Sequence, residues 1–149
     1  MGDLFSMVTI NDNSDGMYSS VAQYSKLYED DAVSGGKLGV SVSTCEDCKY
    51  IVSGCPESSG VGQAVIYRYS SASGAYEQEE VITSPSPTDG MRYGDGVAIS
   101  PGFFDNTAKL AIGEPNAMQV HVYQHPDYTD PSKTFIYEAT LTSPEGKLR

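Results

Sequence analysis

The sequence predicts an all-β protein in which groups of four short antiparallel strands repeat, as in a β-propeller. Three observations lead to this prediction. One ordered series of short segments occurs in residues 38–85 and again in residues 93–144. Within each series the segments are apolar or alternating, and Gly, Pro and Ser separate them, which is typical of strands joined by turns. A repeat of this length built from short strands indicates a β-repeat array such as a propeller.

The first strand of each copy follows a glycine. Leu38-Gly39 opens the series Leu-Gly-Val-Ser-Val-Ser, and Tyr93-Gly94 opens Tyr-Gly-Asp-Gly-Val-Ala-Ile-Ser. Small residues let innermost strands crowd near a central axis. We therefore expect a strand near 97–100, with an equivalent one repeat earlier.

The second strand of each copy ends in Gly-x-Pro. Residues 50–56 read Tyr-Ile-Val-Ser-Gly-Cys-Pro, and residues 109–115 read Lys-Leu-Ala-Ile-Gly-Glu-Pro. Short continuous apolar runs suit strands buried on both faces. We therefore expect Ala111 in the core, so that Ala111→Glu would bury an unpaired charge and prevent folding.

The third and fourth strands complete the repeat. Ala-Val-Ile-Tyr at 64–67 matches Val-His-Val-Tyr at 120–123, and residues 76–85 match residues 135–144, both ending in Thr-Ser-Pro. The acidic run Glu77–Glu80 lies on the fourth strand. We interpret it as a solvated edge strand whose charges block aggregation; the alternative is a docking surface for a basic partner.

A third, worn copy lies at the N-terminus. Leu4–Ile10, Val21–Tyr24 and Tyr28–Val33 match the second, third and fourth strands. The predicted organisation is one propeller-like domain or fragment over residues 1–149, with a partial blade at 1–37 and full blades at 38–92 and 93–149. Because propellers close with about four to eight blades, these units form an incomplete ring.

These motifs resemble the FG-GAP repeat of integrin α subunits and of many secreted or surface proteins. Tyr93-Gly94 stands where the family has Phe-Gly, and Gly113-Glu114-Pro115 and Gly54-Cys55-Pro56 stand where it has Gly-Ala-Pro. The resemblance implies a β-propeller and a non-catalytic binding or scaffold role in extracellular adhesion or in the assembly of a larger complex. The alternative function is a carbohydrate-binding or hydrolytic propeller with its site in the central channel.

Calcium is the ion that the resemblance implies, held in the loop between the first two strands. The loops at 44–49 and 101–108 lack the acidic order that the family uses, so we expect no tight calcium site there. Asn11, Asn13 and Asp15 precede a glycine and imitate the start of a calcium loop. They form a weak calcium candidate, and the alternative is a polar hairpin turn. No other cofactor is expected.

The three cysteines leave several alternatives open. Cys45 and Cys48 form a C-x-x-C, and Cys55 lies in the Gly-x-Pro turn. A zinc site needs four ligands, and no second pair accompanies these residues. A disulfide of Cys45 with Cys48 or Cys55 is one prediction, and free thiols or a metal site are the alternatives.

Composition restricts the partners. The net charge of −11 and the pI near 4.3 would repel nucleic acids. No stretch reaches the length of a membrane-spanning helix. Residues 1–6 are not a signal peptide as they stand, whereas the resemblance favours an extracellular or cell-surface location.

No catalytic constellation is expected. The serines form no Gly-x-Ser-x-Gly elbow, and Gly94-Asp95-Gly96 lacks the lysine and helix of a phosphate loop. His121 and His125 lie on one strand and face the same side. An enzyme is therefore not predicted.

Self-association is the predicted way to complete the ring. We expect strand pairing between Leu4–Ile10 of one chain and residues 135–148 of the next, because exposed strand edges favour pairing. Other protein partners could fill the same role. Two copies would supply roughly six blades.

Overall fold

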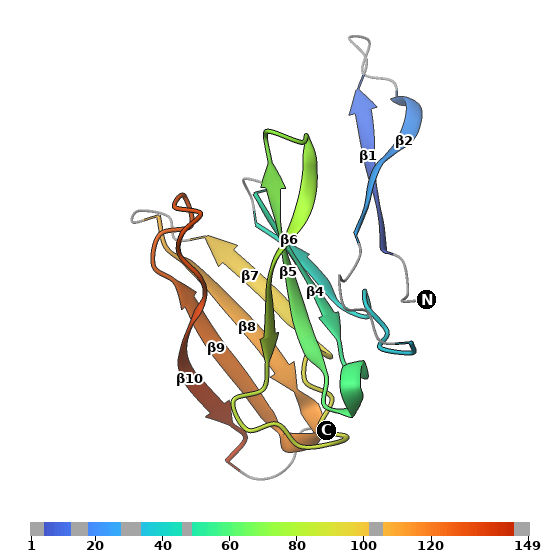
Figure 1. Cartoon of the computed structure of the whole chain (residues 1–149). Helices are drawn as coiled ribbons and strands as arrows, with labels where there is room; N and C mark the ends of the chain where they lie inside the picture. The colour runs from blue at the N-terminus through green and yellow to red at the C-terminus, as the bar shows by residue number, and fades with distance from the viewer. Residues whose placement is uncertain (1–4, 13–17, 28–33, 46–48, 102–105, 145–149) are drawn as a thin grey trace.

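The computed structural model describes residues 5–12, 18–27, 34–45, 49–101 and 106–144, and these residues form an all-β protein. Two four-stranded antiparallel sheets and a two-stranded hairpin account for the strands (Figure 1). The described helical elements are two 3-10 turns of three residues each, after β4 and β8. None of the described helices is long and apolar enough to cross a membrane.

Each four-stranded sheet is a meander of consecutive strands. The first sheet has the order β3-β4-β5-β6 and the second the order β7-β8-β9-β10. The strands of the first sheet are β3 (Val42–Thr44), β4 (Tyr50–Cys55), β5 (Gln63–Ser70) and β6 (Ala75–Thr83). Those of the second sheet are β7 (Val97–Pro101), β8 (Ala108–Glu114), β9 (Gln119–His125) and β10 (Ile136–Thr142). The strands predicted in both copies of the repeat are therefore confirmed.

The N-terminal copy contributes an antiparallel hairpin of β1 (Phe5–Asp12) and β2 (Tyr18–Leu27). Both strands overlap the predicted segments. The fourth strand expected at Tyr28–Val33 lies outside the described residues. The hairpin lies beside the first sheet, on the side away from the second sheet (Figure 1).

Backbone hydrogen bonds repeat between the two sheets. The Gly39 N–H donates to the Gly54 carbonyl oxygen at 3.0 Å, and the Gly54 N–H donates to the Ser41 oxygen at 2.8 Å. In the second sheet, the Gly94 N–H donates to the Gly113 oxygen at 2.9 Å, and the Gly113 N–H donates to the Gly96 oxygen at 2.8 Å. Gly39, Ser41 and Gly54 are thus equivalent to Gly94, Gly96 and Gly113, which agrees with the sequence alignment of the repeats.

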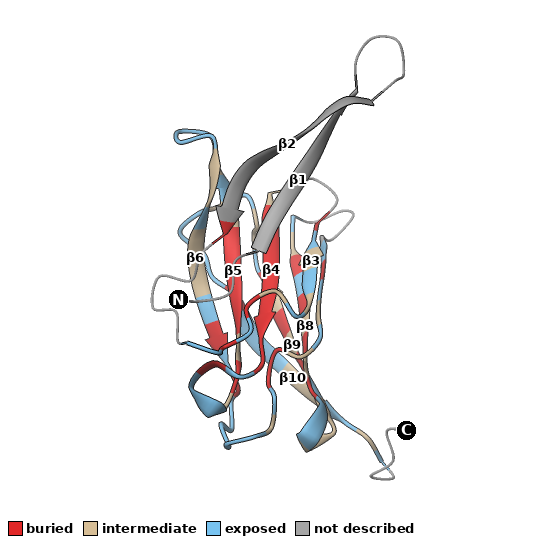
Figure 2. Cartoon of the chain, turned by 90° about the vertical axis from the view of Figure 1, so that its right-hand side faces the viewer, coloured by how far each residue is buried: buried red, intermediate tan, exposed pale blue. Residues whose placement is uncertain are grey.

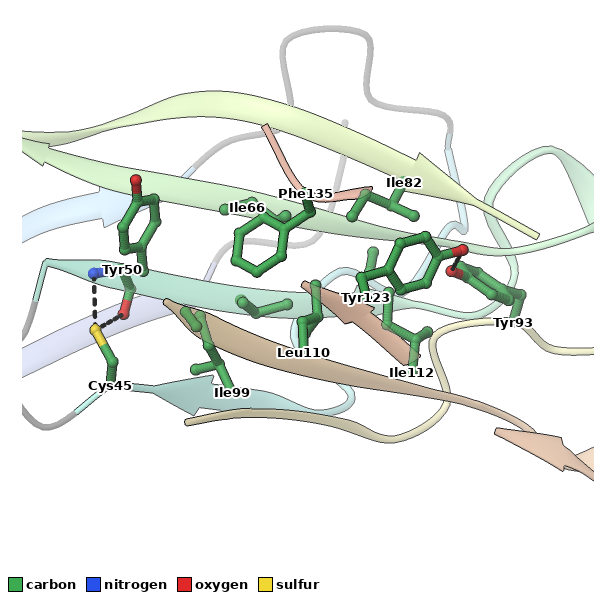
Figure 3. Close-up of a cluster of buried hydrophobic side chains, with 13 residues drawn as sticks. Cys45, Tyr50, Ile66, Ile82, Tyr93, Ile99, Leu110, Ile112, Tyr123 and Phe135 are labelled. Atoms are coloured by element: carbon green, nitrogen blue, oxygen red, sulfur yellow. Dashed lines mark hydrogen bonds between the residues drawn. The ribbon is translucent and has the colours of Figure 1, made fainter. Parts of the chain in front are cut away.

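The two sheets pack against each other through one apolar cluster. Tyr50 and Val52 of β4 in the first sheet share this cluster with Leu110 and Ile112 of β8 in the second. Figure 3 shows the cluster between the strands. We call the face of the first sheet that carries Tyr50 its back, and the face of the second sheet that carries Leu110 its front. The opposite faces are the front of the first sheet and the back of the second. The remaining buried members are Cys45, Ala64, Ile66, Ile82, Tyr93, Ile99, Ala108, Tyr123 and Phe135.

A second cluster covers the front of the first sheet. Ile51 and Cys55 of β4 alternate with Tyr50 and Val52, so their side chains reach the opposite face. There they pack with Leu27, at the end of β2, and with other buried residues. The remaining buried members are Leu38, Val65 and Tyr67. Figure 2 shows the resulting row of buried residues along β4 and β5.

The second sheet is buried less evenly than the first. All six residues of β4 are buried, but β8 alternates between buried and more exposed residues. Ala111 is half-buried and faces away from the first sheet. The expectation that Ala111 belongs to the core is therefore wrong for this chain, because nothing in the described residues covers that face of β8. The described residues form two packed sheets and no closed ring.

The close approach of the two repeats at Gly54 gives a stability prediction. A Cβ added to Gly54 would overlap the carbonyl oxygen of Gly94, whereas a Cβ on Gly96 would meet no atom within 4 Å. We expect Gly54→Ala to lower the free energy of unfolding by about 2–3 kcal/mol, because backbone must shift to admit the methyl group.

The matched control is Gly96→Ala, which adds the same methyl group in open space on the adjoining repeat. Urea denaturation of both variants checks the prediction. Equal stability of the two variants would contradict the close packing described here.

Candidate interaction surface

Two serine hydroxyls at the start of the first sheet accept hydrogen bonds from β7 of the second sheet. The Val97 N–H donates to Ser41 Oγ at 2.9 Å, and the Ile99 N–H donates to Ser43 Oγ at 3.1 Å. These bonds occupy backbone N–H groups of β7 that β8 does not use. They fix the position of β7 along the first sheet.

A buried polar network lies just after the end of β6, at the end of β8 and near the start of β9. The carboxylate oxygen Glu114 Oε2 accepts hydrogen bonds from Ser84 Oγ at 3.2 Å and from His121 Nε2 at 2.6 Å. The other ring nitrogen, His121 Nδ1, lies 2.9 Å from Thr140 Oγ1 of β10. Glu114 and His121 are each 2% exposed. Such a pair is costly to break, because removing one partner leaves a buried polar group unsatisfied.

Two tyrosines extend this network into the apolar cluster. The hydroxyls of Tyr93 and Tyr123 lie 2.8 Å apart, and the Tyr93 ring lies 5.4 Å from the His121 ring. Burial raises the pKa of both phenols above their ordinary value. They remain neutral donors and acceptors at physiological pH.

His125 has a packing role at the other end of β9. Its ring lies 5.0 Å from the Phe135 ring and 6.0 Å from the Tyr50 ring. Its Nε2 donates to the Lys133 carbonyl oxygen at 3.0 Å. Burial lowers the pKa of His125 below its ordinary value. The prediction that His121 and His125 face the same side is confirmed, and both point into the interior.

The structure separates two of the three cysteines. Cys45 Sγ accepts a hydrogen bond from the Tyr50 N–H at 3.3 Å in the cluster between the sheets. Cys55 Sγ lies 2.9 Å from the Gly36 carbonyl oxygen in the cluster on the opposite face. The strand between them directs their side chains to different faces, so this arrangement does not pair them. Cys48 lies outside the described residues, and a disulfide of Cys45 with Cys48 stays a prediction.

The calcium candidate falls mostly outside the described residues. Asn11 lies near the end of β1, and Asn13 and Asp15 belong to residues 13–17, which are not described. The weak calcium site therefore stays a prediction. Among the described residues, no group of three or more His, Cys, Asp or Glu side chains could hold a metal ion.

The acidic run of β6 makes several contacts within the chain. Glu79 lies 3.9 Å from Arg68, and Glu80 accepts a hydrogen bond from the Phe135 N–H at 3.1 Å. Glu77 accepts a bond from Ser73 at 2.6 Å. Burial raises the pKa of Glu79 and Glu80. β6 is an edge strand of its sheet, as predicted. Its glutamates also form hydrogen bonds and an ion pair with other residues of the chain.

An exposed apolar surface lies on the back of the second sheet, and we call it the open face. Its apolar side chains come from all four strands and include Val120 at 36%, Ile136 at 59% and Leu141 at 60% exposure. The register places them together, since Val120 pairs with Leu141 and Ala111 pairs with Ala98. The apolar residues of the open face are Ala98, Ala111, Val120, Val122, Ile136, Ala139 and Leu141.

A polar group borders the open face. Lys109 Nζ donates to Gln124 Oε1 at 2.7 Å and to Glu138 Oε2 at 2.5 Å. An apolar centre with a charged border is the ordinary composition of a protein interface. Contiguous exposed apolar surface of this kind marks an interaction site more often than scattered single residues do.

The repeat shows what such a face looks like when it is covered. The alignment and the strand register make four apolar positions on the back of the first sheet equivalent to four positions on the back of the second sheet. These pairs are Val52 with Ala111, Ala64 with Val120, Ile66 with Val122, and Ile82 with Leu141. In the first sheet, their exposures are 0%, 0%, 0% and 6%. In the second sheet, every one of the four positions is half-buried or exposed.

No family model, no curated protein and no solved structure matches the chain.

The polar network predicts a coupling between Glu114 and His121. Either Glu114→Leu or His121→Leu alone leaves the other side chain buried without its main partner, so each should cost about 3 kcal/mol or more in unfolding free energy. The double variant replaces both partners with apolar groups and should cost less than the sum. A double-mutant cycle by urea denaturation should give an interaction energy of about 1–3 kcal/mol. Additive losses would show that the two groups are not coupled.

His125 predicts a pH dependence of stability. Its lowered pKa means that the unfolded chain takes up a proton at higher pH than the folded protein does. The free energy of unfolding should therefore fall as pH drops below about 6.5. His125→Phe keeps an aromatic ring and removes the ionisable group, so its unfolding free energy should fall less between about pH 7.5 and 5.5.

The comparison with His125→Phe isolates this contribution from the half-buried carboxyl groups of Glu79 and Glu80, whose raised pKa values act in the opposite direction. Urea denaturation of wild type and variant at both pH values measures it. Parallel pH profiles would be inconsistent with a lowered pKa at His125.

Proposed function

We propose that this chain is a non-catalytic binding and scaffold module of the FG-GAP β-propeller type. In this proposal the two four-stranded sheets are consecutive blades of an incomplete ring. The resemblance of the repeat motifs adds a role in extracellular adhesion or in the assembly of a larger complex.

The observation that carries the proposal is the front-to-back packing of the sheets. Leu110 and Ile112 on the front of the second sheet are equivalent to Ile51 and Ser53 on the front of the first. The second sheet therefore packs against the first with its front, and the first sheet packs against Leu27 with its own front. Each step from one unit to the next uses the same two faces, as in a radial array of blades. A simple sandwich of two sheets needs only one buried face on each sheet.

The order of the strands agrees with a blade. β3 and β7 are the first strands of their sheets and meet through Ser41 and Ser43. β6, the last strand of the first sheet, carries the acidic run at the edge. A change from small inner residues to charged outer residues suits strands that run from a central axis to the rim.

A binding role agrees with the use of the ionisable groups in the interior. Glu114, His121 and His125 are buried and bonded between strands. Groups that hold a core together this closely are unavailable to a substrate. The open face exposes apolar side chains such as Leu141, and exposed apolar surface favours association over chemistry.

Electron microscopy of the assembled protein tests the proposal. We expect sheets arranged radially around one axis, with β3 and β7 nearest to it, and no response on a glycan array or a panel of hydrolase substrates. A pair of stacked sheets with no common axis would contradict the blade interpretation. Turnover or glycan binding would favour a propeller with a site in its central channel.

A further inference from the structure

In the described part of the chain nothing packs on the open face, although the equivalent face of the first sheet is covered. Val52 and Ile82 on the back of the first sheet are 0% and 6% exposed, because the second sheet packs on them. Ala111 and Leu141 take their places on the open face, where Ala111 is half-buried and Leu141 is 60% exposed. Exposed apolar surface of this kind marks an interaction site.

The hydroxyl groups of the covered interface are missing from the open face. Within the chain, Ser41 and Ser43 accept hydrogen bonds from two N–H groups of β7, the first strand of the second sheet. The repeat register places Gly96 and Ala98 at these two positions of the open face. Neither residue has a side chain that can accept a hydrogen bond. A further sheet placed in the same front-to-back way would therefore bury two N–H groups of its first strand without acceptors, which is unfavourable.

The open face of a second copy avoids this cost. In each copy, the N–H groups of Val97 and Ile99 already donate to serine hydroxyls of the same chain. Two open faces that pack back to back bring together β7 strands whose N–H groups at these positions are satisfied before the copies meet. Antiparallel sheets pack face to face through apolar side chains in this way. The hydrogen bonds thus favour a second copy over a further unit of the front-to-back series.

Cross-strand pairing arranges the open face in three rows that run across the strands. The middle row contains alanine and valine alone, and its members are Ala98, Ala111, Val122 and Ala139. One outer row ends in Leu141 and is uncharged. The other outer row contains Lys109 and ends in Ile136, and Lys109 forms an ion pair with Glu138. Small side chains in the middle row let two such faces approach closely.

A two-fold axis that crosses the strands at right angles matches these rows between two copies. It lays the middle row of one copy on the middle row of the other, and each charged row on an uncharged row. Leu141 of one copy then lies against Ile136 of the other, and these side chains are 60% and 59% exposed in the single chain. The Lys109–Glu138 pairs lie at opposite ends of the contact, so like charges do not meet. The open face is therefore complementary to itself.

The same axis keeps corresponding strands together, as the interface within the chain does. There β7 lies against the start of the first sheet, and the N–H of Phe135, just before β10, donates to Glu80 of β6. Between two copies, β7 lies beside β7 and β10 lies beside β10. The side chain of Ala98 on β7 is small and that of Leu141 on β10 is large, so the two sheets diverge toward β10. Sheets that radiate from one axis diverge in this way.

We propose that two copies of this chain associate back to back through their open faces, related by a two-fold axis across the strands. The contact is isologous, because the same surface comes from each copy. This inference rests on the proposed function, because it treats the four sheets of the two copies as blades around one axis. It differs from the strand pairing expected from the sequence, which stays a separate prediction.

The charge of the chain gives the contact a characteristic salt dependence. Each copy carries a net charge of −11, so two copies repel each other at low salt. Salt screens this repulsion, and apolar contact does not depend on opposite charges. The association should therefore persist or strengthen as salt rises, whereas a basic partner would dissociate.

Sedimentation of the full chain and of three lysine variants tests the inference. We expect a wild-type dimer, and we expect Val120→Lys and Leu141→Lys to weaken self-association by about tenfold or more. Val42→Lys is the matched control, because Val42 and Val120 are both 36% exposed but Val42 lies on β3 of the first sheet. All three changes make the net charge less negative by the same amount. Leu141 is 60% exposed on an edge strand, so its variant keeps the test valid if Val120→Lys does not fold.

Cysteine cross-linking determines the orientation of the two copies. The proposed axis places Ala98 of one copy against Ala98 of the other, whereas an axis along the strands would place it against Ala139. With a short thiol-reactive cross-linker, we expect Ala98→Cys alone to give a linked dimer, and peptide mass spectrometry to locate the link between the two copies of position 98. In a mixture of Ala98→Cys and Ala139→Cys chains, links between positions 98 and 139 alone would overturn the proposed arrangement.

Other outcomes are equally decisive. A wild-type monomer at all concentrations, a dimer insensitive to Val120→Lys and Leu141→Lys, or a dimer that dissociates as salt rises would overturn the inference. These results would leave the proposed function standing, because a different protein could supply the next sheet. A dimer with the expected cross-links whose sheets show no common axis by microscopy would instead confirm the contact and contradict the proposed function.

Discussion

The packing of the back of one sheet on the front of the next is the constraint on which the rest of the structure depends. It requires backbone of one repeat to approach backbone of the other at Gly54 and Gly94, where a side chain on Gly54 would collide. That approach brings β3 and β7 close enough for the serine hydroxyls of β3 and of the turn before it to reach backbone N–H groups. The apolar layer around Leu110 then fills the remaining space. The glycine of the first Gly-x-Pro turn, Gly54, therefore has a steric reason in this contact.

Most of the strands could be predicted from the sequence because two copies of one series reinforce each other. The turn residues locate the ends of β8 and β9, and the repeat transfers those ends to β4 and β5. Burial was harder to predict, because Val52 and Ala111 occupy the same place in the repeat and only one of them has a neighbouring sheet. Local sequence predicts the strand and shows that both of its faces are apolar. It does not show which of these faces another sheet covers.

The candidate sites show the same limit. Glu114 and His121 lie on neighbouring strands, and their third partner, Ser84, comes from the other sheet, so no short motif joins them. The cysteines were closer to prediction, because alternation along β4 puts Cys55 on the face of Ile51 and away from Tyr50. The open face was visible in the sequence only as the apolar residues of ordinary strands. It became a candidate surface when the register placed Val120 beside Leu141 and the first sheet supplied a covered version for comparison.

Repeated units of similar sequence carry a risk of pairing in the wrong order, and the Glu114–His121 pair bears on that risk. The equivalent positions in the first sheet are Cys55 and Val65, which pack in a wholly apolar cluster. The front of the second sheet therefore needs a surface that supplies a hydroxyl such as that of Ser84, since a buried carboxylate in apolar surroundings is strongly unfavourable. The two junctions are chemically distinct even though their backbones repeat. A sheet without such a hydroxyl would leave the buried acid short of one hydrogen bond, so the two junctions are not chemically interchangeable.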